Sequence, residues 1–207
     1  MNTSLKTLTL RRNDITAIGA IALGRSLNPI GSNDTLEQLD LGQNPVEVQG
    51  WAFLIENSID IFSSVTVQSP RCGDDGCDDL SDAIASNTNL KHLCLFDNGL
   101  TDNAAEGLYG SLQDHSSLTV LDVEGNFLSA SGAETLVNAC SRGGVAMIPL
   151  PLGANCIGPA CPASLVEKGG GLKELWLGYN SLGPTGAMAV SAIFSIDCRL
   201  DLLDLEG

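Results

Sequence analysis

The sequence predicts an α/β array of repeated units, each made of one strand and one helix. Two observations lead to this prediction. One apolar pattern recurs eight times along the 207 residues, about 28 residues apart. Within each copy, apolar residues first alternate, as in a strand with one buried face, and then recur at helical spacing. A fixed period that joins these two patterns is typical of a solenoid whose copies stack on one another.

The strand half of each copy has apolar residues at positions i, i+3, i+5 and i+10 and an asparagine at i+8. LKHLCLFDNGL and LTVLDVEGNFL fit this frame, whereas the third copy has Pro70 at the asparagine position and the eighth stops before reaching it. The eight anchors at position i, which number the copies from one to eight, are Leu5, Leu36, Phe62, Leu90, Leu118, Met147, Leu172 and Leu200. The frame predicts that i, i+3 and i+5 point inward while i+2, i+4, i+6 and i+7 point to solvent.

The helical half begins with a small residue four positions after the last apolar slot. These residues are Gly19, Gly50, Gly76, Ala104, Gly132, Cys161 and Gly186. We expect the small side chain to let each helix lie close to the strand layer, because a larger side chain would separate the two.

The period, the frame and the small-residue helix motif resemble the leucine-rich repeat family, and within it the ribonuclease-inhibitor-like class. The resemblance covers essentially the whole chain. It implies a single horseshoe-shaped solenoid over residues 1–207, with a parallel sheet on the concave side, helices on the convex side, and about seven full repeats plus a truncated eighth. It also implies a structural ladder in which each asparagine amide bonds the backbone of the turn after its strand. The ladder residues are Asn13, Asn44, Asn98, Asn126, Asn155 and Asn180.

Two regions depart from the pattern. Residues 141–171 place Pro149 and Pro151 inside a strand, and we expect a weakened sheet there because proline has no N–H to donate. The chain also starts almost directly on a strand and stops within the eighth copy, so we expect no terminal caps. This favours either a fragment of a longer array, such as a repeat receptor, or a chain that self-associates through its ends.

Composition argues against several classes of partner. With 25 acidic and 10 basic residues the formal net charge is −15, which repels the phosphate backbone of nucleic acids. We find no apolar run long enough to span a membrane. Seven cysteines are scattered without a CxxC pair, which favours buried, reduced thiols in the cytoplasm. We expect no metal and no cofactor.

The concave face carries the candidate binding residues. Trp176 at i+4 and Tyr179 at i+7 of the seventh copy are expected to be exposed there, beside acidic residues. The full candidate set is Trp176, Tyr179, Phe96, Asp40, Asp97, Asp122, Glu124, Asp204, Arg11 and Arg12. Exposed aromatic residues are frequent binding hot spots, and an acidic surface attracts basic partners. Two alternatives stay open: Trp176 packs against the irregular sixth copy, and the acidic rows are only a solvated face.

The sequence offers little for catalysis or metal binding. His92 and Cys94 alternate on one strand, but no third group is placed to orient them apart from Asp97 or Asp122, so we assign no catalytic residue. The acidic run CGDDGCDD, residues 72–79, lacks the residue alternation and distal glutamate of a calcium loop. Its carboxylates are better explained by a helix start.

We therefore predict a non-enzymatic protein–protein interaction module that binds a basic protein or peptide on its concave face. The resemblance also implies an alternative, because the activating protein of the Ran GTPase contains similar repeats. In that case Arg11 and Arg12, the clustered arginines of the concave face, would engage the GTPase. A truncated fragment of a larger repeat receptor is the other alternative.

Overall fold

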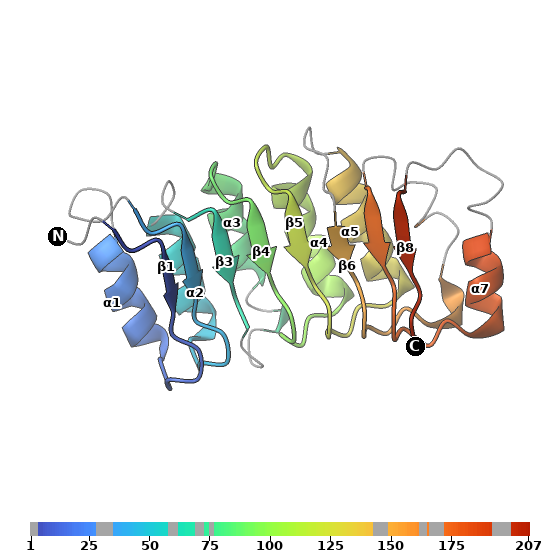
Figure 1. Ribbon diagram of the computed structural model, residues 1–207, viewed down its shortest axis with the longest axis horizontal. Helices are drawn as coiled ribbons and strands as arrows, with labels where there is room; N and C mark the ends of the chain where they lie inside the picture. The colour runs from blue at the N-terminus through green and yellow to red at the C-terminus, as the bar shows by residue number, and fades with distance from the viewer. Residues whose placement is uncertain are drawn as a thin grey trace.

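The computed structural model of the chain describes residues 4–27, 35–57, 62–68, 73–74, 77–142, 149–161, 165, 172–191 and 200–207. These residues form eight short strands that lie side by side in chain order (Figure 1). The strands are β1 (Thr7–Thr9), β2 (Gln38–Asp40), β3 (Ser64–Thr66), β4 (His92–Cys94), β5 (Val120–Asp122), β6 (Pro149–Pro151), β7 (Glu174–Trp176) and β8 (Leu202–Asp204). Each starts two residues after its predicted anchor, so the predicted strand positions are confirmed.

All paired strands are parallel, and equivalent residues of neighbouring copies face one another. Leu93 pairs with Val65 on one side and Leu121 on the other. The side chains at i+3 are buried in the central copies, with Leu121 fully inaccessible to solvent, while the flanking residues of each strand lie at the opposite face. The predicted inward and outward directions are therefore confirmed. A shift by one residue would have exchanged the two faces.

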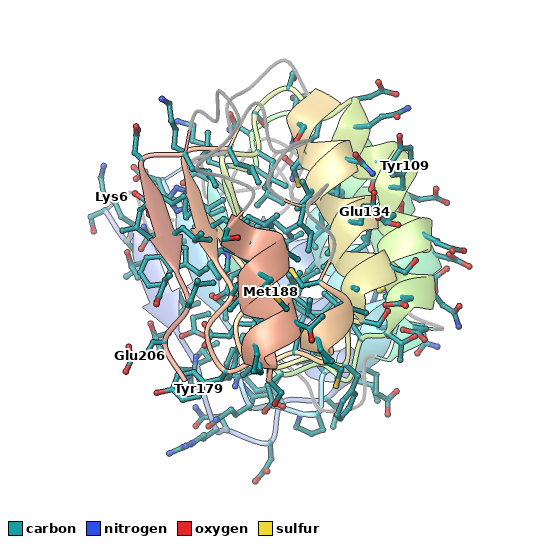
Figure 2. All side chains as sticks on the ribbon, turned by 90° about the vertical axis from the view of Figure 1, so that its right-hand side faces the viewer. Lys6, Tyr109, Glu134, Tyr179, Met188 and Glu206 are labelled. Carbon is teal, nitrogen blue, oxygen red and sulfur yellow. The ribbon has the colours of Figure 1, made fainter. Side chains whose placement is uncertain are left out.

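The helices cover the inward side of the sheet and leave its other side open (Figures 1 and 2). They are α1 (Ala17–Leu27), α2 (Glu47–Asn57), α3 (Cys77–Ser86), α4 (Asp102–Gln113), α5 (Ala130–Arg142) and α7 (Gly183–Ser191). In the sixth copy the described residues form a short 3-10 helix, η2 (Gly158–Ala160), in place of a regular helix start. We call the uncovered side the open face; it is formed by the residues at i+2, i+4 and i+6 and, at its rim, by those at i+7.

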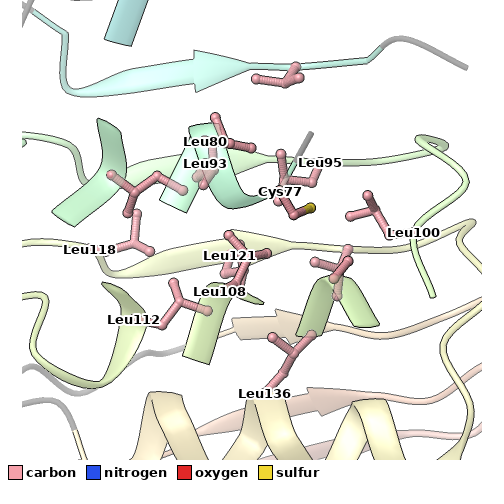
Figure 3. Close-up of a cluster of buried hydrophobic side chains, with 14 of the residues drawn as sticks. Cys77, Leu80, Leu93, Leu95, Leu100, Leu108, Leu112, Leu118, Leu121 and Leu136 are labelled. Atoms are coloured by element: carbon pink, nitrogen blue, oxygen red, sulfur yellow. The ribbon is translucent and has the colours of Figure 1, made fainter. Parts of the chain in front are cut away.

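A single apolar core runs between the sheet and the helices along the array. Its central part contains Leu93, Leu121 and Leu108, which come from β4, β5 and α4 (Figure 3). Because each copy buries its leucines against the next, the stability of a copy depends on its neighbours.

Two of the small residues at the helix starts have a different role from the one predicted. A Cβ atom at Gly132 would lie 2.3 Å from Asp102 Oδ1 and 3.1 Å from Asp102 Cα. At Gly50 it would lie 2.9 Å from Ala17 Cα. At these two positions the close approach is to the helix of the preceding copy, and the glycine sets the distance between the two helices. A Cβ atom at Gly19 or Gly186 would instead meet the side chain of Ile15 or Leu182 in its own copy.

The row of strands is interrupted where the sequence predicted a weakness. Strands β1–β5 form one hydrogen-bonded sheet and β6–β8 another. Val123 still donates to the Pro151 carbonyl at 3.2 Å, and Gly125 to the Gly153 carbonyl at 3.0 Å. The bonds that Pro149 and Pro151 would donate cannot form, because neither has an N–H. The interruption of the hydrogen-bonded sheet lies beside these two prolines, although β6 keeps its place beside β5.

No helix among the described residues combines the length and apolar character that crossing a membrane requires.

Candidate functional site

The asparagine at i+8 ties each strand to the turn of its neighbour. The side-chain oxygen of Asn126 accepts the N–H groups of Asn98 and Leu100, both at 3.0 Å. Its Nδ2 donates to the carbonyls of Leu95 and Val123. Asn44, Asn98, Asn155 and Asn180 make comparable bonds with their own turns and the preceding copy, whereas Asn13 in the first copy bonds its own turn. In the copies that have this asparagine, the column fixes the end of the strand and thus the spacing of residues on the open face.

The residue before each of these asparagines adopts a left-handed backbone conformation. The angle φ is 55° at Asp97 and 58° at Tyr179, and it is also positive at Arg12, Gln43, Gly125 and Ala154. Only Gly125 among them is the residue type that usually occupies this region. The sequence frame did not predict this sharp turn, which ends the strand at the rim of the open face.

The two predicted aromatic residues of the seventh copy are exposed. Trp176 retains 39% of its accessible surface, and its indole N–H donates to Glu174 Oε2 at 3.3 Å. Tyr179 retains 62%, and its hydroxyl lies 3.4 Å from Glu206 Oε1. Figure 2 shows Tyr179 and Glu206 close together at one end of the strands, away from Met188 on α7. Trp176 pairs in register with Pro151 on one side and Asp204 on the other.

Carboxylates surround these aromatic residues. Burial raises the pKa of Glu124 above its usual value, and the negative charges of Asp122 and Asp204 raise it further. Glu124 reaches over Gly153, where a Cβ atom would lie 3.2 Å from Glu124 Oε1.

We define the acidic-aromatic patch as Asp122, Glu124, Trp176, Tyr179, Asp204 and Glu206. Among the described residues, the ion pairs are Lys6–Glu37, Arg11–Asp40 and Lys173–Asp201, so no described cation pairs with the patch.

The arginines of the first copy are engaged within the chain. Arg11 Nη1 lies 3.4 Å from both carboxylate oxygens of Asp40, and Arg11 Nη2 donates to Gln68 Oε1 at 2.6 Å. Arg12 Nε donates to Gln43 Oε1. The candidate residues Arg11 and Asp40 therefore satisfy each other in this part of the open face.

The remaining candidates lie between these two regions. Phe96 is half-buried and its ring covers Gly125, where a Cβ atom would lie 3.1 Å from Phe96 Cε2. Asp97 is exposed at the rim. The sequence frame missed Phe127, which is 62% exposed at i+9 of the fifth copy. Phe127 could have been identified from the sequence, because it is an apolar residue at a position that the frame does not direct inward.

The strand pair His92 and Cys94 lacks a reactive thiol. Cys94 Sγ lies 3.4 Å from Asp122 Oδ2. Burial and the negative charge of Asp122 raise the pKa of Cys94 to about 12. A thiol with this pKa is protonated at neutral pH, whereas cysteine nucleophiles act as thiolates. This strand pair therefore has the wrong electrostatic environment for cysteine catalysis.

The described part of the acidic run links neighbouring copies. Asp74 accepts the N–H of Thr101 at 2.8 Å and its hydroxyl at 2.5 Å, and Thr101 is the N-cap of α4. Asp78 and Asp79 lie in the first turn of α3, as the helix-start explanation predicts. Asp74 thus supports the helix of the next copy, which the sequence did not indicate.

Comparison with known proteins agrees with this architecture. A model of the leucine-rich repeat family matches residues 2–24, 86–108 and 114–137. Ribonuclease inhibitor from Sus scrofa is 27% identical over 188 residues, covering 88% of this chain and 41% of that protein. The NACHT, LRR and PYD domains-containing protein 14 from Homo sapiens is 29% identical over 164 residues, covering 63% of this chain and 15% of that protein. The chain therefore spans less than half the length of either relative.

Among solved structures, the yeast complex of Rad7 and Elc1 contains a similar fold. The superposition has a TM-score of 0.55 at 15% sequence identity and covers 97% of this chain and 56% of that one. At this identity the likeness concerns the fold alone. The repeated frame and the stacked strand–helix units form a leucine-rich repeat fold, and these matches make the chain similar to leucine-rich repeat proteins of the ribonuclease-inhibitor-like kind.

Proposed function

We propose that this chain is a non-enzymatic protein-binding module whose contact surface is the open face at the fifth to eighth copies. The observation that carries the proposal is the acidic-aromatic patch, in which exposed Trp176 and Tyr179 lie among carboxylates that no described cation neutralises. Aromatic side chains contribute strongly to interfaces, and charges that are unpaired in the free protein favour a partner of opposite charge. The partner is a basic protein or peptide.

The distribution of charge along the open face supports this location over the first copies. Arg11 already bonds both Asp40 and Gln68, so a partner would have to break those contacts before binding there. The GTPase-activator alternative depends on Arg11 and Arg12, and both side chains hydrogen-bond within the chain. No observation favours that alternative. The proposal applies to these repeats and not to the activities of the longer relatives.

The experiment is a selection of binders from a library of random peptides displayed on phage, using the 207-residue chain as bait. The affinity of each enriched peptide is then measured for three proteins: the wild type, a double variant with Trp176→Ala and Tyr179→Ala, and the single variant Met188→Ala. Met188 is 66% exposed on α7 and serves as the matched control. We expect the enriched peptides to be basic and to lose at least about tenfold in affinity with the double variant only. Peptides that bind all three proteins equally would contradict the proposal.

A further inference from the structure

The open face already binds one guanidinium group, that of Arg11 of the same chain. The guanidinium of Arg11, at i+6 of the first copy, extends over Gly42, at i+6 of the second. A Cβ atom at Gly42 would lie 2.7 Å from Arg11 Nη1 and 3.0 Å from Arg11 Cζ. Asp40, at i+4 of the second copy, and Gln68, at i+6 of the third, accept hydrogen bonds from this group. The arrangement needs a glycine beneath the guanidinium and acceptors on both sides.

The seventh copy repeats this arrangement without its arginine. Gly178 occupies the position of Gly42, and Gly153 occupies the position of Arg11 in the copy before it. No side chain of the preceding copy can therefore extend over Gly178 from that position. The three atoms nearest to a Cβ at Gly178 are all backbone atoms of Glu206. None of these three atoms belongs to a side chain, whereas the atoms nearest to a Cβ at Gly42 belong to the side chains of Arg11 and Asp40.

The groups around Gly178 suit a positive charge better than those around Gly42. Glu206 stands where Gln68 stands in the third copy, and Trp176 stands where Asp40 stands in the second. Glu124 reaches over Gly153 from the other side, and Asp204 pairs with Trp176 in register. A guanidinium here could bond a carboxylate with two N–H groups and stack on the indole ring, which a lysine ammonium does less well.

We propose that the surface above Gly178 binds an arginine side chain of the partner protein, with Glu206 and Glu124 as acceptors and Trp176 as the stacking face. This inference rests on the proposed function and specifies the residue that the partner supplies. The partner's arginine would lie above Gly178 in the sheet β6–β8, as Arg11 lies above Gly42 in the sheet β1–β5. One positive charge of the partner then binds at a defined site, in addition to the general attraction between the acidic open face and a basic protein.

The test uses a defined probe, the blocked tripeptide Ac-Gly-Arg-Gly-NH2, titrated into the isotopically labelled 207-residue chain while amide and indole N–H signals are followed by NMR. We expect saturable shifts at the amides of Gly153 and Gly178 and at the Trp176 indole. Two probes provide controls. Replacing arginine by the uncharged isostere citrulline should abolish the shifts, and replacing it by lysine should weaken binding.

Two variants provide the matched comparison. A double variant with Glu124→Gln and Glu206→Gln should bind the arginine probe about tenfold more weakly, because it lacks both charged acceptors. Asp79→Asn, Asp82→Asn removes the same amount of charge from exposed positions of α3 and should leave the shifts unchanged. Equal shifts with citrulline, unchanged shifts in Glu124→Gln, Glu206→Gln, or the absence of shifts at Gly178 would each overturn the inference.

The two proposals can fail separately. If library peptides depend on Trp176 and Tyr179 while the arginine probe gives no shifts at Gly178, the arginine site is wrong and the binding surface stands. If the arginine probe binds as expected but enriched peptides ignore both aromatic residues, the proposed protein-binding surface is wrong.

Discussion

Asp102, the first residue of α4, binds the residue that precedes α5 through both carboxylate oxygens. Asp102 Oδ1 accepts the N–H of Ser129 at 2.8 Å, and Oδ2 accepts its hydroxyl at 2.5 Å. Asp74 holds Thr101 in the same way one copy earlier. The carboxylate at one helix start thus fixes the next, in addition to the contacts of the apolar core.

We expect Asp102→Ala to lower the free energy of unfolding by about 1 to 3 kcal/mol, because it removes two hydrogen bonds to a charged acceptor. Urea unfolding followed by circular dichroism measures the change. Glu106→Ala, at an exposed position of the same helix, is the control and should change stability by less than about 0.5 kcal/mol. Equal effects of the two substitutions would show that the Asp102–Ser129 contact has no special role.

The strand register predicts opposite outcomes for two adjacent residues of β5. Leu121 is fully buried, so Leu121→Ala should cost about 2 to 5 kcal/mol of stability through lost burial and a cavity. Asp122 lies on the open face, so Asp122→Ala should cost less than about 1 kcal/mol. Denaturant unfolding of both variants gives the comparison. A larger loss for Asp122→Ala than for Leu121→Ala is incompatible with the register.

The fold was predictable because its causes are local and repeated. Leu93, Leu121 and Leu175 occupy the same slot of the frame, so each copy supports the assignment of the others, and all eight strands begin where the frame places them. Pro149 and Pro151 were equally informative, since a missing N–H interrupts a parallel ladder wherever it occurs. The small residue Gly132 was recognised but misinterpreted, because its neighbour Asp102 lies in another copy.

The candidate site was less predictable because side-chain direction depends on neighbouring copies. The frame placed Arg11, Trp176 and Tyr179 on the same face, but it did not show that Arg11 turns across Gly42 toward Gln68. It also gave no reason for the left-handed conformation at Tyr179. Phe127 was missed because the frame assigns no role to position i+9.

His115 should make stability depend on pH. Its buried Nδ1 accepts the N–H groups of Ser117 and Leu118, and Asn87 Oδ1 accepts the equivalent pair one copy earlier. Burial lowers the pKa of His115 below its usual 6.5, partly opposed by the carbonyls of Asn87 and Ile84. The folded state therefore favours the neutral ring. Its contribution is complete above pH 6.5 and is lost as the pH falls from 6.5 toward the lower folded-state pKa.

Within that window we expect the wild type to lose more stability as the pH falls than His115→Asn, since asparagine keeps an acceptor but does not titrate. Urea unfolding of both proteins between pH 7.5 and pH 5 measures the difference. Parallel stability curves over this range would rule out His115 as the source of the dependence.

Cys94 should be a slow thiol despite its place on the open face. With its pKa raised to about 12 by burial and Asp122, little thiolate exists near neutral pH. We expect iodoacetamide to modify exposed Cys156 before Cys94 in the folded protein, as read by peptide mass mapping. Asp122→Asn should accelerate the reaction of Cys94. Faster labelling of Cys94 than of Cys156 in the wild type would disprove the assigned environment.

A protein partner that lies on the acidic-aromatic patch should be captured there by photo-crosslinking. The photoreactive amino acid p-benzoylphenylalanine replaces Tyr179 in one protein and Met188 in another, and each is illuminated with a peptide from the library selection. Both positions are exposed, Tyr179 beside the open face and Met188 on α7. We expect a covalent adduct from position 179 and none from position 188. An adduct from position 188 alone would place the partner on the helical side and contradict it.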